Sequence, residues 1–313
     1  MLVSVALPIY NGLPYLHEAI ANILTQDVEF ELIISDDGSS DGSREAVQKL
    51  SDPRIRILFN ETNAGIFGNL NRCIAAAKGP FIQVFSQDDV MRPGYLASQV
   101  RMLQKHPAAG LVYGMPESID ANGAVVGTKL GDNTPEVIDA KMYLWIASHY
   151  MALPPSISSV MIPRRTFDAV GPFNPAYRVA GDIEFYNRVS ERFSILRNVE
   201  VLHAVRTHKS MTSVLPSTGS SYLREELTME QWYRSRWSAG DYRKVKRFRA
   251  ISRGRYHLGW IARAARAGRI AEALTALWRL NELYPLHWVI GCRVLSFFRP
   301  HWHPQPAVPP LRL

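Results

Sequence analysis

Residues 81–90 read FIQVFSQDDV, an apolar run that ends in two adjacent carboxylates, Asp88 and Asp89. Adjacent acids repel each other and aspartate is a poor strand former, so the pair needs an explanation. A solvated turn is one. A divalent cation is the other, because Mg²⁺ and Mn²⁺ prefer carboxylate and phosphate oxygens as ligands. We predict that these acids hold Mg²⁺ or Mn²⁺, which would bridge a diphosphate and neutralise its charge.

A second acidic pair, Asp36 and Asp37, ends the apolar stretch FELIIS and precedes GSSDGS. Carboxylates at such a junction can accept hydrogen bonds from a base N–H and a ribose hydroxyl, and Gly38 lets the backbone approach a ligand closely. An Asp-Gly turn that caps a helix is the alternative explanation. Both interpretations stay open on this stretch alone.

The chain up to these acids alternates between strand-like and helix-like patterns. Buried strands are predicted at 3–9, 30–35, 55–59 and 81–85, and helices at 15–24, 41–50 and 68–78. Asp41 is expected to cap the second helix, and Gly79 to follow the end of the third. This alternation predicts an α/β fold, a mostly parallel, Rossmann-like sheet with helices on both faces.

Polar residues follow each of the four predicted strands. They are 8–11, 36–37, 60–63 and 88–89. In open parallel sheets, ligands bind outside the carboxyl ends of the strands. The sequence therefore predicts one ligand site along this edge of the sheet.

The rest of the chain divides into a mixed strand and helix region and a purely helical region. Helices at 93–104, 141–150 and 184–192 and strands at 110–113 and 158–162 are expected before residue 216, with many loops over 114–155. Residues 222–283 have helical spacing and no strand signal, and resemble a helical hairpin that turns at Gly268. We predict a domain at 1–215 and a helical C-terminal region at 216–313.

Charge is unevenly distributed between these parts. Residues 1–222 hold 19 Lys and Arg against 22 Asp and Glu, whereas residues 223–313 hold 17 against 6. The C-terminal region therefore suits an anionic partner, such as an anionic membrane surface, or it is a helical appendage with a solvated basic face. Residues 284–298 are too short and too charged to span a bilayer, so they could lie in a membrane interface or pack on the rest of the protein.

The cysteines and the first residues bear on the compartment. Cys73 and Cys292 are far apart in the sequence and form no CxxC pattern, which fits a reducing environment. The stretch MLVSVALPIY has no basic segment before its short apolar run, so we expect no signal peptide. A cytoplasmic location is predicted, either free or peripheral at the inner face of the cell membrane.

Several stretches together resemble the core of glycosyltransferase family 2, over about residues 2–215. They are VSVALPIYNG, ELIISDDGSSDGS, NAGIFGNLNRCIAAAKGPFIQVFSQDDV, VMIPRRTFDAVGPFNPAYRVAGDIEFYNRV and VRTHKSMTS. The resemblance implies a GT-A fold and inverting transfer of a hexosyl or deoxyhexosyl group from a nucleotide-diphosphate sugar to a hydroxyl. The family commonly builds bacterial cell-surface polysaccharides, often on lipid-linked acceptors.

The resemblance also implies which residues bind the donor and the metal. The expected nucleotide-sugar contacts are Pro8, Tyr10, Asn11, Asp36 or Asp37, Asn63, Gly65 and Asn71. Ser86, Gln87 and Asp88 take the place of the family's DxD motif, so Ser86 replaces the first Asp. Asp89 is then the first choice for a metal ligand, with Asp88 as a further ligand or a ribose–diphosphate contact.

Asp182 matches the aspartate of the family's Glu-Asp motif, the catalytic base, with Gly181 where Glu often stands. An inverting transfer needs one carboxylate within hydrogen-bond reach of the acceptor hydroxyl. Glu184 is the fallback, and a plain helix cap is the other explanation for Asp182. The resemblance places His208 near the metal or the diphosphate, and Arg206 beside it favours an anion-facing loop.

Other functions are less well supported. Ser86 and Gly181 weaken two motifs, so a non-catalytic nucleotide-sugar-binding protein is the alternative. A sugar-nucleotide pyrophosphorylase would need a glycine-rich first loop with Arg and Lys, which PIYNGLPY lacks. We expect no nucleic-acid partner, because the C-terminal region contains no recognised DNA or RNA module.

Overall fold

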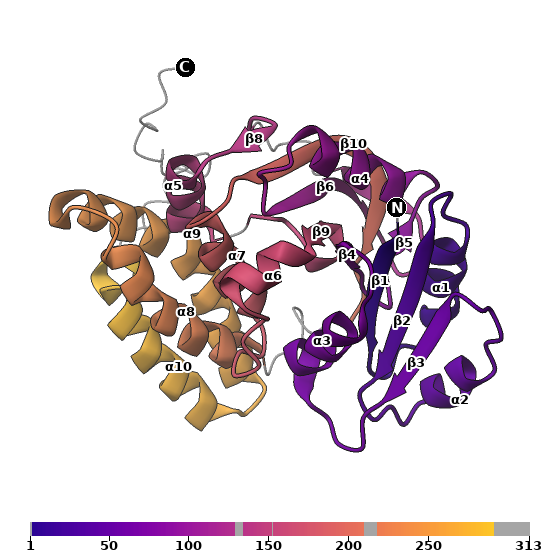
Figure 1. Ribbon diagram of the computed structural model, residues 1–313. Helices are drawn as coiled ribbons and strands as arrows, with labels where there is room; N and C mark the ends of the chain where they lie inside the picture. Colours follow the sequence, from indigo (N-terminus) through magenta and orange to yellow (C-terminus); the bar gives the residue numbers. More distant parts are fainter. Residues whose placement is uncertain (1, 129–133, 152, 210–217, 291–313) are drawn as a thin grey trace. The chain divides into compact units, whose positions relative to one another are not determined.

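The computed structural model describes residues 2–128, 134–151, 153–209 and 218–290. They fall into two compact units (Figure 1). The N-terminal unit comprises the described residues of Met1–Tyr143 and Leu153–His208, and the C-terminal unit those of Leu144–Ala152 and Lys209–Leu313. The described residues of 144–152, in the middle of the chain, thus belong to the same unit as the C-terminal helices.

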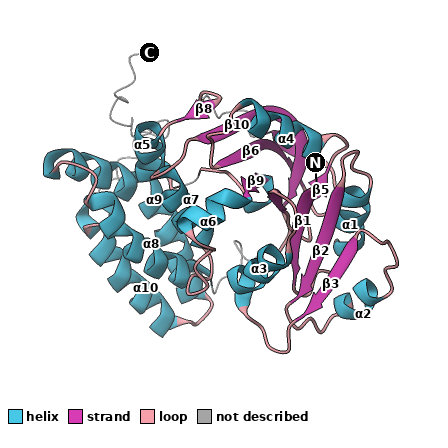
Figure 2. Ribbon diagram, viewed as in Figure 1, coloured by secondary structure: helices cyan, strands magenta, loops and turns pink. Residues whose placement is uncertain are grey.

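The N-terminal unit is built on one mixed sheet, whose described strands run in the order β3-β2-β1-β4-β9-β6-β10-β5 (Figure 2). Four neighbouring strands are parallel: β1 (Val3–Ile9), β2 (Phe30–Asp36), β3 (Ile55–Phe59) and β4 (Phe81–Val84). The other strands are β5 (Val90–Met91), β6 (Leu111–Ile119), β7 (Val125–Thr128), β8 (Val137–Ile138), β9 (Val160–Pro163) and β10 (Ile195–Arg206). β9 runs antiparallel to both β4 and β6, so the sheet is mostly parallel on only one side.

Helices cover both faces of this sheet. They are α1 (Leu16–Leu24), α2 (Ser43–Gln48), α3 (Gly65–Ala76), α4 (Tyr95–Lys105), α6 (Arg164–Val170) and α7 (Gly181–Ser190). In the sheet, β2 and β3 lie on one side of β1, and β4 lies on the other side. The chain therefore moves one way along the sheet from β1 to β2 and the opposite way from β3 to β4. Because both crossovers are right-handed, α3 must cover the other face from α1. The α/β fold with helices on both faces is as predicted.

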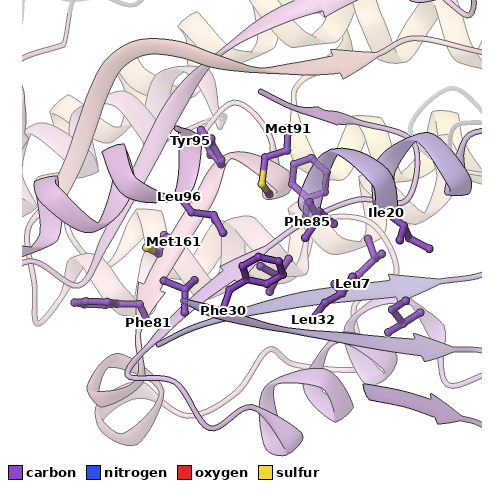
Figure 3. Close-up of a cluster of buried hydrophobic side chains, with 14 of the residues drawn as sticks. Leu7, Ile20, Phe30, Leu32, Phe81, Phe85, Met91, Tyr95, Leu96 and Met161 are labelled. Carbon is purple, nitrogen blue, oxygen red and sulfur yellow. The ribbon is translucent and has the colours of Figure 1, made fainter. Parts of the chain in front are cut away.

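The main core lies between the sheet and helices α1 and α4 (Figure 3). Alternate residues of β1 contribute to it, including Leu7, and α1 adds Ile20 while α4 adds Leu96. This period of two follows from the pleat of a strand, which sends successive side chains to opposite faces. The packing holds the carboxyl ends of β1, β2 and β4 in fixed register.

Two local predictions were wrong. α2 begins after Gly42, not Asp41; the Asp41 carboxylate instead accepts hydrogen bonds from the backbone N–H groups of Ser43 and Leu13. α3 ends at Ala76, so Gly79 does not close it. Gly79 is required for another reason, since a Cβ there would lie 2.7 Å from the carbonyl oxygen of Leu2.

The C-terminal unit contains α8 (Thr218–Arg234), α9 (Ala239–Arg266) and α10 (Ile270–Leu283), and α5 (Ala140–Tyr150) reaches into it. α9 and α10 form the expected hairpin at Gly268, which has φ of 76°. Its core joins small and large residues, including Ala264, Ala276 and Trp260. Within the described residues no helix combines the length and the hydropathy needed to cross a membrane.

Candidate functional site

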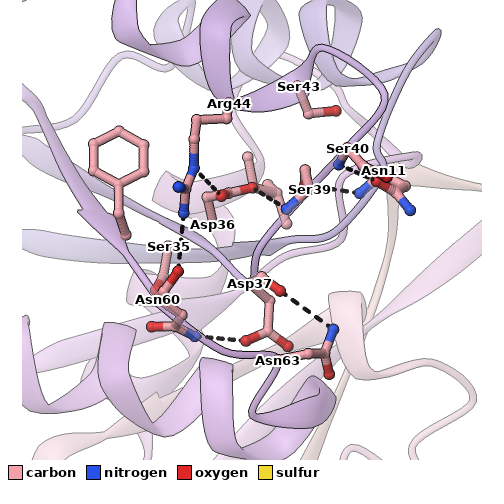
Figure 4. A network of polar contacts seen from close by, with 12 residues as sticks. Asn11, Ser35, Asp36, Asp37, Ser39, Ser40, Ser43, Arg44, Asn60 and Asn63 are labelled. Atoms are coloured by element: carbon pink, nitrogen blue, oxygen red, sulfur yellow. Dashed lines mark hydrogen bonds and ion pairs between the residues drawn. The ribbon is translucent and has the colours of Figure 1, made fainter.

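The loop after β1 is bound to the loop after β2 along the predicted edge of the sheet (Figure 4). The N–H of Asn11 donates to Ser39 Oγ at 2.9 Å, and Asn11 Oδ1 accepts from the N–H of Ser40 at 2.8 Å. One residue on, the N–H of Gly12 donates to Ser43 Oγ at 2.9 Å. Asn11 has φ of 48°, in the left-handed region that asparagine tolerates better than most residues. The two loops therefore form one ordered rim.

Tyr10 is held at this rim by its backbone. Its N–H donates to Gln87 Oε1 at 2.8 Å, and its carbonyl accepts from Gln87 Nε2 at 3.0 Å. The Tyr10 side chain is 48% exposed, so its ring can contact a ligand while the backbone stays fixed. Pro8 precedes it inside β1, paired with Ser35 of β2. Gln87 thus joins the first strand to the acidic segment after β4.

Asp36 and Asp37 are both buried but bind different partners (Figure 4). Asp36 forms an ion pair with Arg44 of α2, with 2.8 Å between Oδ2 and Nε. Asp37 Oδ1 accepts from Asn60 Nδ2 at 2.6 Å and from the N–H of Ala64 at 2.8 Å. The two carboxylates therefore brace opposite sides of the rim, Asp36 towards α2 and Asp37 towards α3.

Asn63 holds the start of α3 by two hydrogen bonds. Asn63 donates to the carbonyl of Asp37 at 3.2 Å and accepts from the N–H of Gly65 at 3.0 Å. Asn63 and Gly65 are exposed, and Gly65 has φ of 74°, which explains the glycine. Both therefore lie on the accessible side of the rim.

Asn71, further along α3, is committed to a different contact. Its Nδ2 donates to the carbonyl of Phe173 at 2.7 Å, and its Oδ1 accepts from the N–H of the same residue at 3.0 Å. This pair of bonds ties α3 to the loop before α7. The Asn71 side chain therefore positions that loop, a role that sequence comparison alone did not suggest.

Asp88 and His208 lie against each other beyond the end of β4. Asp88 Oδ2 is 2.9 Å from His208 Nε2, and the side chains are 21% and 12% exposed. The ring of Tyr15 lies 4.8 Å from the imidazole, measured between ring centroids. Two donor atoms about 3 Å apart can both contact one ion at about 2.1 Å. The described residues hold no group of three or more potential His, Cys, Asp or Glu ligands.

These two residues nevertheless fit a Mg²⁺ or Mn²⁺ ion. Mg²⁺ is usually held by one or two carboxylates together with substrate phosphates and waters, so Asp88 with His208 is a sufficient protein contribution. A carboxylate oxygen and an imidazole nitrogen are also both acceptable donors for Mn²⁺. The pair is partly exposed, so a diphosphate can reach it.

Asp89 points into the protein, away from this pair. It is buried, and Oδ1 accepts from the N–H of Arg206 at 2.9 Å while Oδ2 accepts from the hydroxyl of Ser158. Burial, and then the charge of Asp88, raise the pKa of Asp89 to about 7. We therefore rank Asp88 and His208 ahead of Asp89 as ligands.

From the protein interior, Arg206 supports the segment that carries Asp88 and Asp89. Its Nε donates to the carbonyl of Asp88 at 2.9 Å, its Nη2 lies 2.6 Å from Glu18 Oε2, and its guanidinium stacks 4.6 Å from the ring centre of Tyr15. The side chain is almost completely buried. Arg206 therefore does not face an anion in solvent, as the sequence suggested, but orients the segment that carries Asp88.

Asp182 lies at the start of α7, half-buried, and its Oδ1 accepts from the N–H of Ile183 at 2.9 Å. The preceding Gly181 packs directly on the ring of Phe67 in α3, where a Cβ would lie 2.7 Å from Cε2. This contact explains why glycine stands where the family often has Glu. It also places the start of α7 beside α3, whose first turn binds Asp37.

Glu184, the fallback base, has another role. Its carboxylate is 2.7 Å from Nε of Arg188, and Arg188 also donates to the carbonyls of Val170 and Pro172. Glu184 and Arg188 therefore brace the loop before α7. Among the carboxylates on the first turn of α7, Asp182 remains the candidate base.

Comparisons with known proteins identify a family match over part of the sequence and solved structures of similar fold. Residues 4–151 match the family described as Glycosyl transferase family 2. A curated relative is the UDP-Glc:alpha-D-GlcNAc-diphosphoundecaprenol beta-1,3-glucosyltransferase WfgD of Escherichia coli, 35% identical over 127 residues, 40% of this chain and 49% of that protein. Three longer curated relatives match at 27% to 29% identity, and the chain spans only 21% to 35% of their length.

Solved structures share the fold along almost the whole chain. The S. aureus TarS 1–349 complex with UDP-GlcNAc has a TM-score of 0.59 at 17% identity, covering 97% of this chain and 93% of that one. The mannosyltransferase PcManGT from Pyrobaculum calidifontis, in complex with GDP-Man and Mn²⁺, has a TM-score of 0.58 at 18% identity, covering 96% and 88%. Residues 4–151 therefore match glycosyltransferase family 2, and the chain, with its α/β sheet, shares the GT-A fold of these solved structures.

Proposed function

We propose that this protein is an inverting glycosyltransferase that transfers a hexosyl or deoxyhexosyl group from a nucleotide-diphosphate sugar to a hydroxyl of a glycan or lipid-linked acceptor. The observation that carries the proposal is the pairing of Asp88 with His208, 2.9 Å apart, beyond the parallel strands. The rim that continues from it, through Tyr10 and Asn63, offers exposed groups for a nucleotide. The nucleotide sugars in the titles of the TarS and PcManGT structures support this donor class.

In this proposal each part of the rim has a separate task. The ring of Tyr10 and the polar groups around Asn63 and Gly65 contact the nucleotide, and Asp36 and Asp37 keep the rim in shape from inside. Asp88 and His208 hold Mg²⁺ or Mn²⁺, which when bound neutralises charge on the departing nucleoside diphosphate. Arg206 keeps the backbone of Asp88 in place.

Asp182 is the proposed base. A half-buried carboxylate at the start of a helix can accept a proton from the acceptor hydroxyl as that oxygen attacks the anomeric carbon. The bond from the anomeric carbon to the diphosphate oxygen breaks as the new glycosidic bond forms, and the configuration inverts. Gly181 and Phe67 position Asp182 relative to the donor side of the rim.

The experiment compares Asp182→Asn with Asp168→Asn. Asp168 is an exposed aspartate on the neighbouring α6, so its variant controls for the chemical change itself. Release of nucleoside diphosphate from a panel of nucleotide sugars would be followed with a bacterial lipid extract as acceptor. We expect Asp182→Asn to lose about 10²- to 10⁴-fold in rate and to keep Mn²⁺-dependent thermal stabilisation by the nucleotide, with Asp168→Asn unchanged.

A non-catalytic nucleotide-sugar-binding protein is the second candidate, favoured by Ser86 and Gly181 in two family motifs. It predicts nucleotide-dependent stabilisation without turnover in the wild type. Equal turnover by the wild type and Asp182→Asn would reject Asp182 as the base and leave the transfer reaction in place.

We further propose that the protein works in cell-surface polysaccharide synthesis at the cytoplasmic face of the cell membrane, as a peripheral protein. The undecaprenol-linked acceptor in the name of the WfgD relative supports this setting, as does the basic C-terminal region. Co-sedimentation of the full chain with anionic vesicles measures it, and a chain that stays in the supernatant at low salt rejects it.

A further inference from the structure

Helix α10 exposes a stripe of large apolar side chains. Ile270, Leu274 and Trp278 are 53%, 61% and 62% exposed, and their spacing of four residues places them along one face of the helix. The other face is also apolar, because Ala273, Ala276 and Leu280 are buried in the core of the C-terminal unit. The buried face already accounts for the folding of α10, so the exposed stripe needs another explanation.

Exposed cations lie next to this stripe in the sequence and in the hairpin. Arg263 and Arg266 are exposed in the last turns of α9, directly before the turn at Gly268 into α10. Earlier on α9, Arg243, Lys244 and Arg247 are exposed as well. A surface that combines large apolar side chains with arginines complements an anionic bilayer, which offers both hydrocarbon and phosphates.

The size of the stripe argues for a membrane and against a protein partner. Large side chains present about 150–250 Å² each when fully exposed, so the three together present about 300–400 Å² at the observed exposures. A stable protein–protein interface buries about 800 Å² on each partner. A few side chains are enough for shallow insertion at the headgroup level, where tryptophan is enriched.

The segment that the sequence suggested for this role is placed differently. Tyr284 and Val289 are buried in the core of the C-terminal unit, and a Cβ on Gly254 of α9 would lie 2.6 Å from Val289 Cγ1. Residues 284–290 therefore belong largely to the packed unit. Residues 291–298 lie outside the described residues.

We propose that the Ile270, Leu274 and Trp278 face of α10 inserts into the interfacial layer of an anionic membrane, while Arg263 and Arg266 bind lipid phosphates. This inference rests on the proposed function at a membrane and names the surface that would serve it. It attaches the chain to the surface in which a lipid-linked acceptor is anchored.

The test is binding of the full chain to vesicles of phosphatidylcholine alone and of phosphatidylcholine with phosphatidylglycerol. The wild type should bind the anionic vesicles, and Leu274→Ser with Trp278→Ser should weaken binding at least tenfold. Val199→Ser is the matched control, because Val199 is 62% exposed in the N-terminal unit. Arg263→Gln with Arg266→Gln should weaken binding about 25-fold, at roughly fivefold for each charge, and reduce its salt dependence.

Two measurements separate this inference from the transfer reaction and from self-association. Resistance of the C-terminal unit to proteolysis and Mn²⁺-dependent stabilisation of the N-terminal unit by nucleotides should both be the same in the stripe variant and the wild type, so loss of vesicle binding is not unfolding of either unit. Vesicle binding that survives Leu274→Ser with Trp278→Ser, or no binding by the wild type, overturns the inference. A dimer in size-exclusion chromatography that the stripe variant abolishes would make the stripe a contact between copies, which also overturns it.

Discussion

Two adjacent carboxylates at one strand end have different tasks. Asp88 pairs with His208 at the accessible rim, whereas Asp89 turns inward to Arg206 and Ser158. Asp36 and Asp37 also bind different partners, Arg44 and Asn60, but both are buried. Asp88 lies in the turn after β4 and Asp89 follows it, so the turn exposes one carboxylate and buries the other.

This division predicts opposite phenotypes for two neighbouring substitutions. Asp88→Asn should abolish the Mn²⁺ dependence of nucleotide binding and change the free energy of unfolding by less than about 0.5 kcal/mol, because Asp88 is partly exposed. Asp89→Asn should lower that free energy by about 1–3 kcal/mol, since an amide cannot satisfy both buried donors. Thermal shift titrations with Mn²⁺ and urea unfolding measure the two effects.

The reverse result, with Asp89→Asn folding normally and losing the metal, would make Asp89 the ligand. His17→Ala provides a control for His208→Ala in the same titrations, because His17 is exposed on α1. Removing His208 should weaken Mn²⁺ binding by at least about 10- to 100-fold, the loss that follows when only a hydrogen-bond partner of a ligand is removed, and removing His17 should not.

The sequence was sufficient to predict that the acids follow the strand ends, but neither which of them are accessible nor their partners. Gln87 binds the backbone of Tyr10, and Arg206 binds that of Asp88, across 77 and 118 residues of chain. The local sequence predicts neither contact, because a glutamine or an arginine that follows a strand can equally well be exposed to solvent. Only the fold brings these pairs together.

Among the elements, the apolar strands were predictable and the polar or very short ones were not. β1 to β4 are short apolar runs, whereas β10 (Ile195–Arg206) contains polar residues and an irregular pairing between Asn198 and His203. β5 and β8 have two residues each, which is too few for any periodicity. Hydrophobic patterning detects strands that are continuous apolar runs, and it misses strands that are rich in polar residues or only two residues long.

Helix packing explains one departure from the family motif and can be tested. Gly181→Ala brings a Cβ to 2.7 Å from the Phe67 ring and should lower the free energy of unfolding by about 1–3 kcal/mol, as overpacking does. Gly240→Ala is the matched control in the first turn of α9, because nothing lies within 4 Å of its Cβ position. That variant should be neutral or stabilising by up to about 1 kcal/mol.

Urea unfolding gives both values, and transfer activity adds a second reading. If Gly181→Ala is as stable as the wild type, Phe67 is free to move and does not position Asp182. Equal loss of stability by both alanine variants would point to the glycine conformation itself and not to the contact with Phe67.

At the scale of the whole molecule, the C-terminal unit has an ionic centre of its own. Glu226 is fully buried, with Arg249 at 3.0 Å, Arg253 at 3.4 Å and His257 at 3.2 Å, and it accepts from the hydroxyl of Tyr284. Burial alone would raise the pKa of Glu226, but the charge of Arg253, the hydrogen bond from His257 and the charge of Arg249 hold it well below its usual value.

Glu226→Gln should therefore destabilise this unit by about 3–5 kcal/mol, because it removes the buried carboxylate that Arg249 and Arg253 share. Of the described carboxylates, Arg249 then keeps only Glu230, at 3.1 Å. Since the folded-state pKa is depressed, the stabilisation is present above about pH 4.5 and is lost as the pH falls below it. The wild-type unit should lose stability in that acid range, and Glu226→Gln should lose less. Glu282→Gln, an exposed site on α10, is the control in proteolysis and tryptophan fluorescence.

Nucleotide binding would report on the N-terminal unit in the same samples. If Glu226→Gln abolishes Mn²⁺-dependent nucleotide binding as well, the two units unfold together. A pH profile of Glu226→Gln that matches the wild type would show that another group controls acid stability.

The uneven charge has a further physical effect. A chain with 22 acidic against 19 basic residues up to position 222, and 6 against 17 after it, is an electric dipole. Near an anionic surface such a dipole experiences a torque as well as an attraction, within a distance set by the Debye length of about 8 Å at physiological salt. The C-terminal unit, which carries α9 and α10, would therefore be drawn towards the lipid before any side chain touches it.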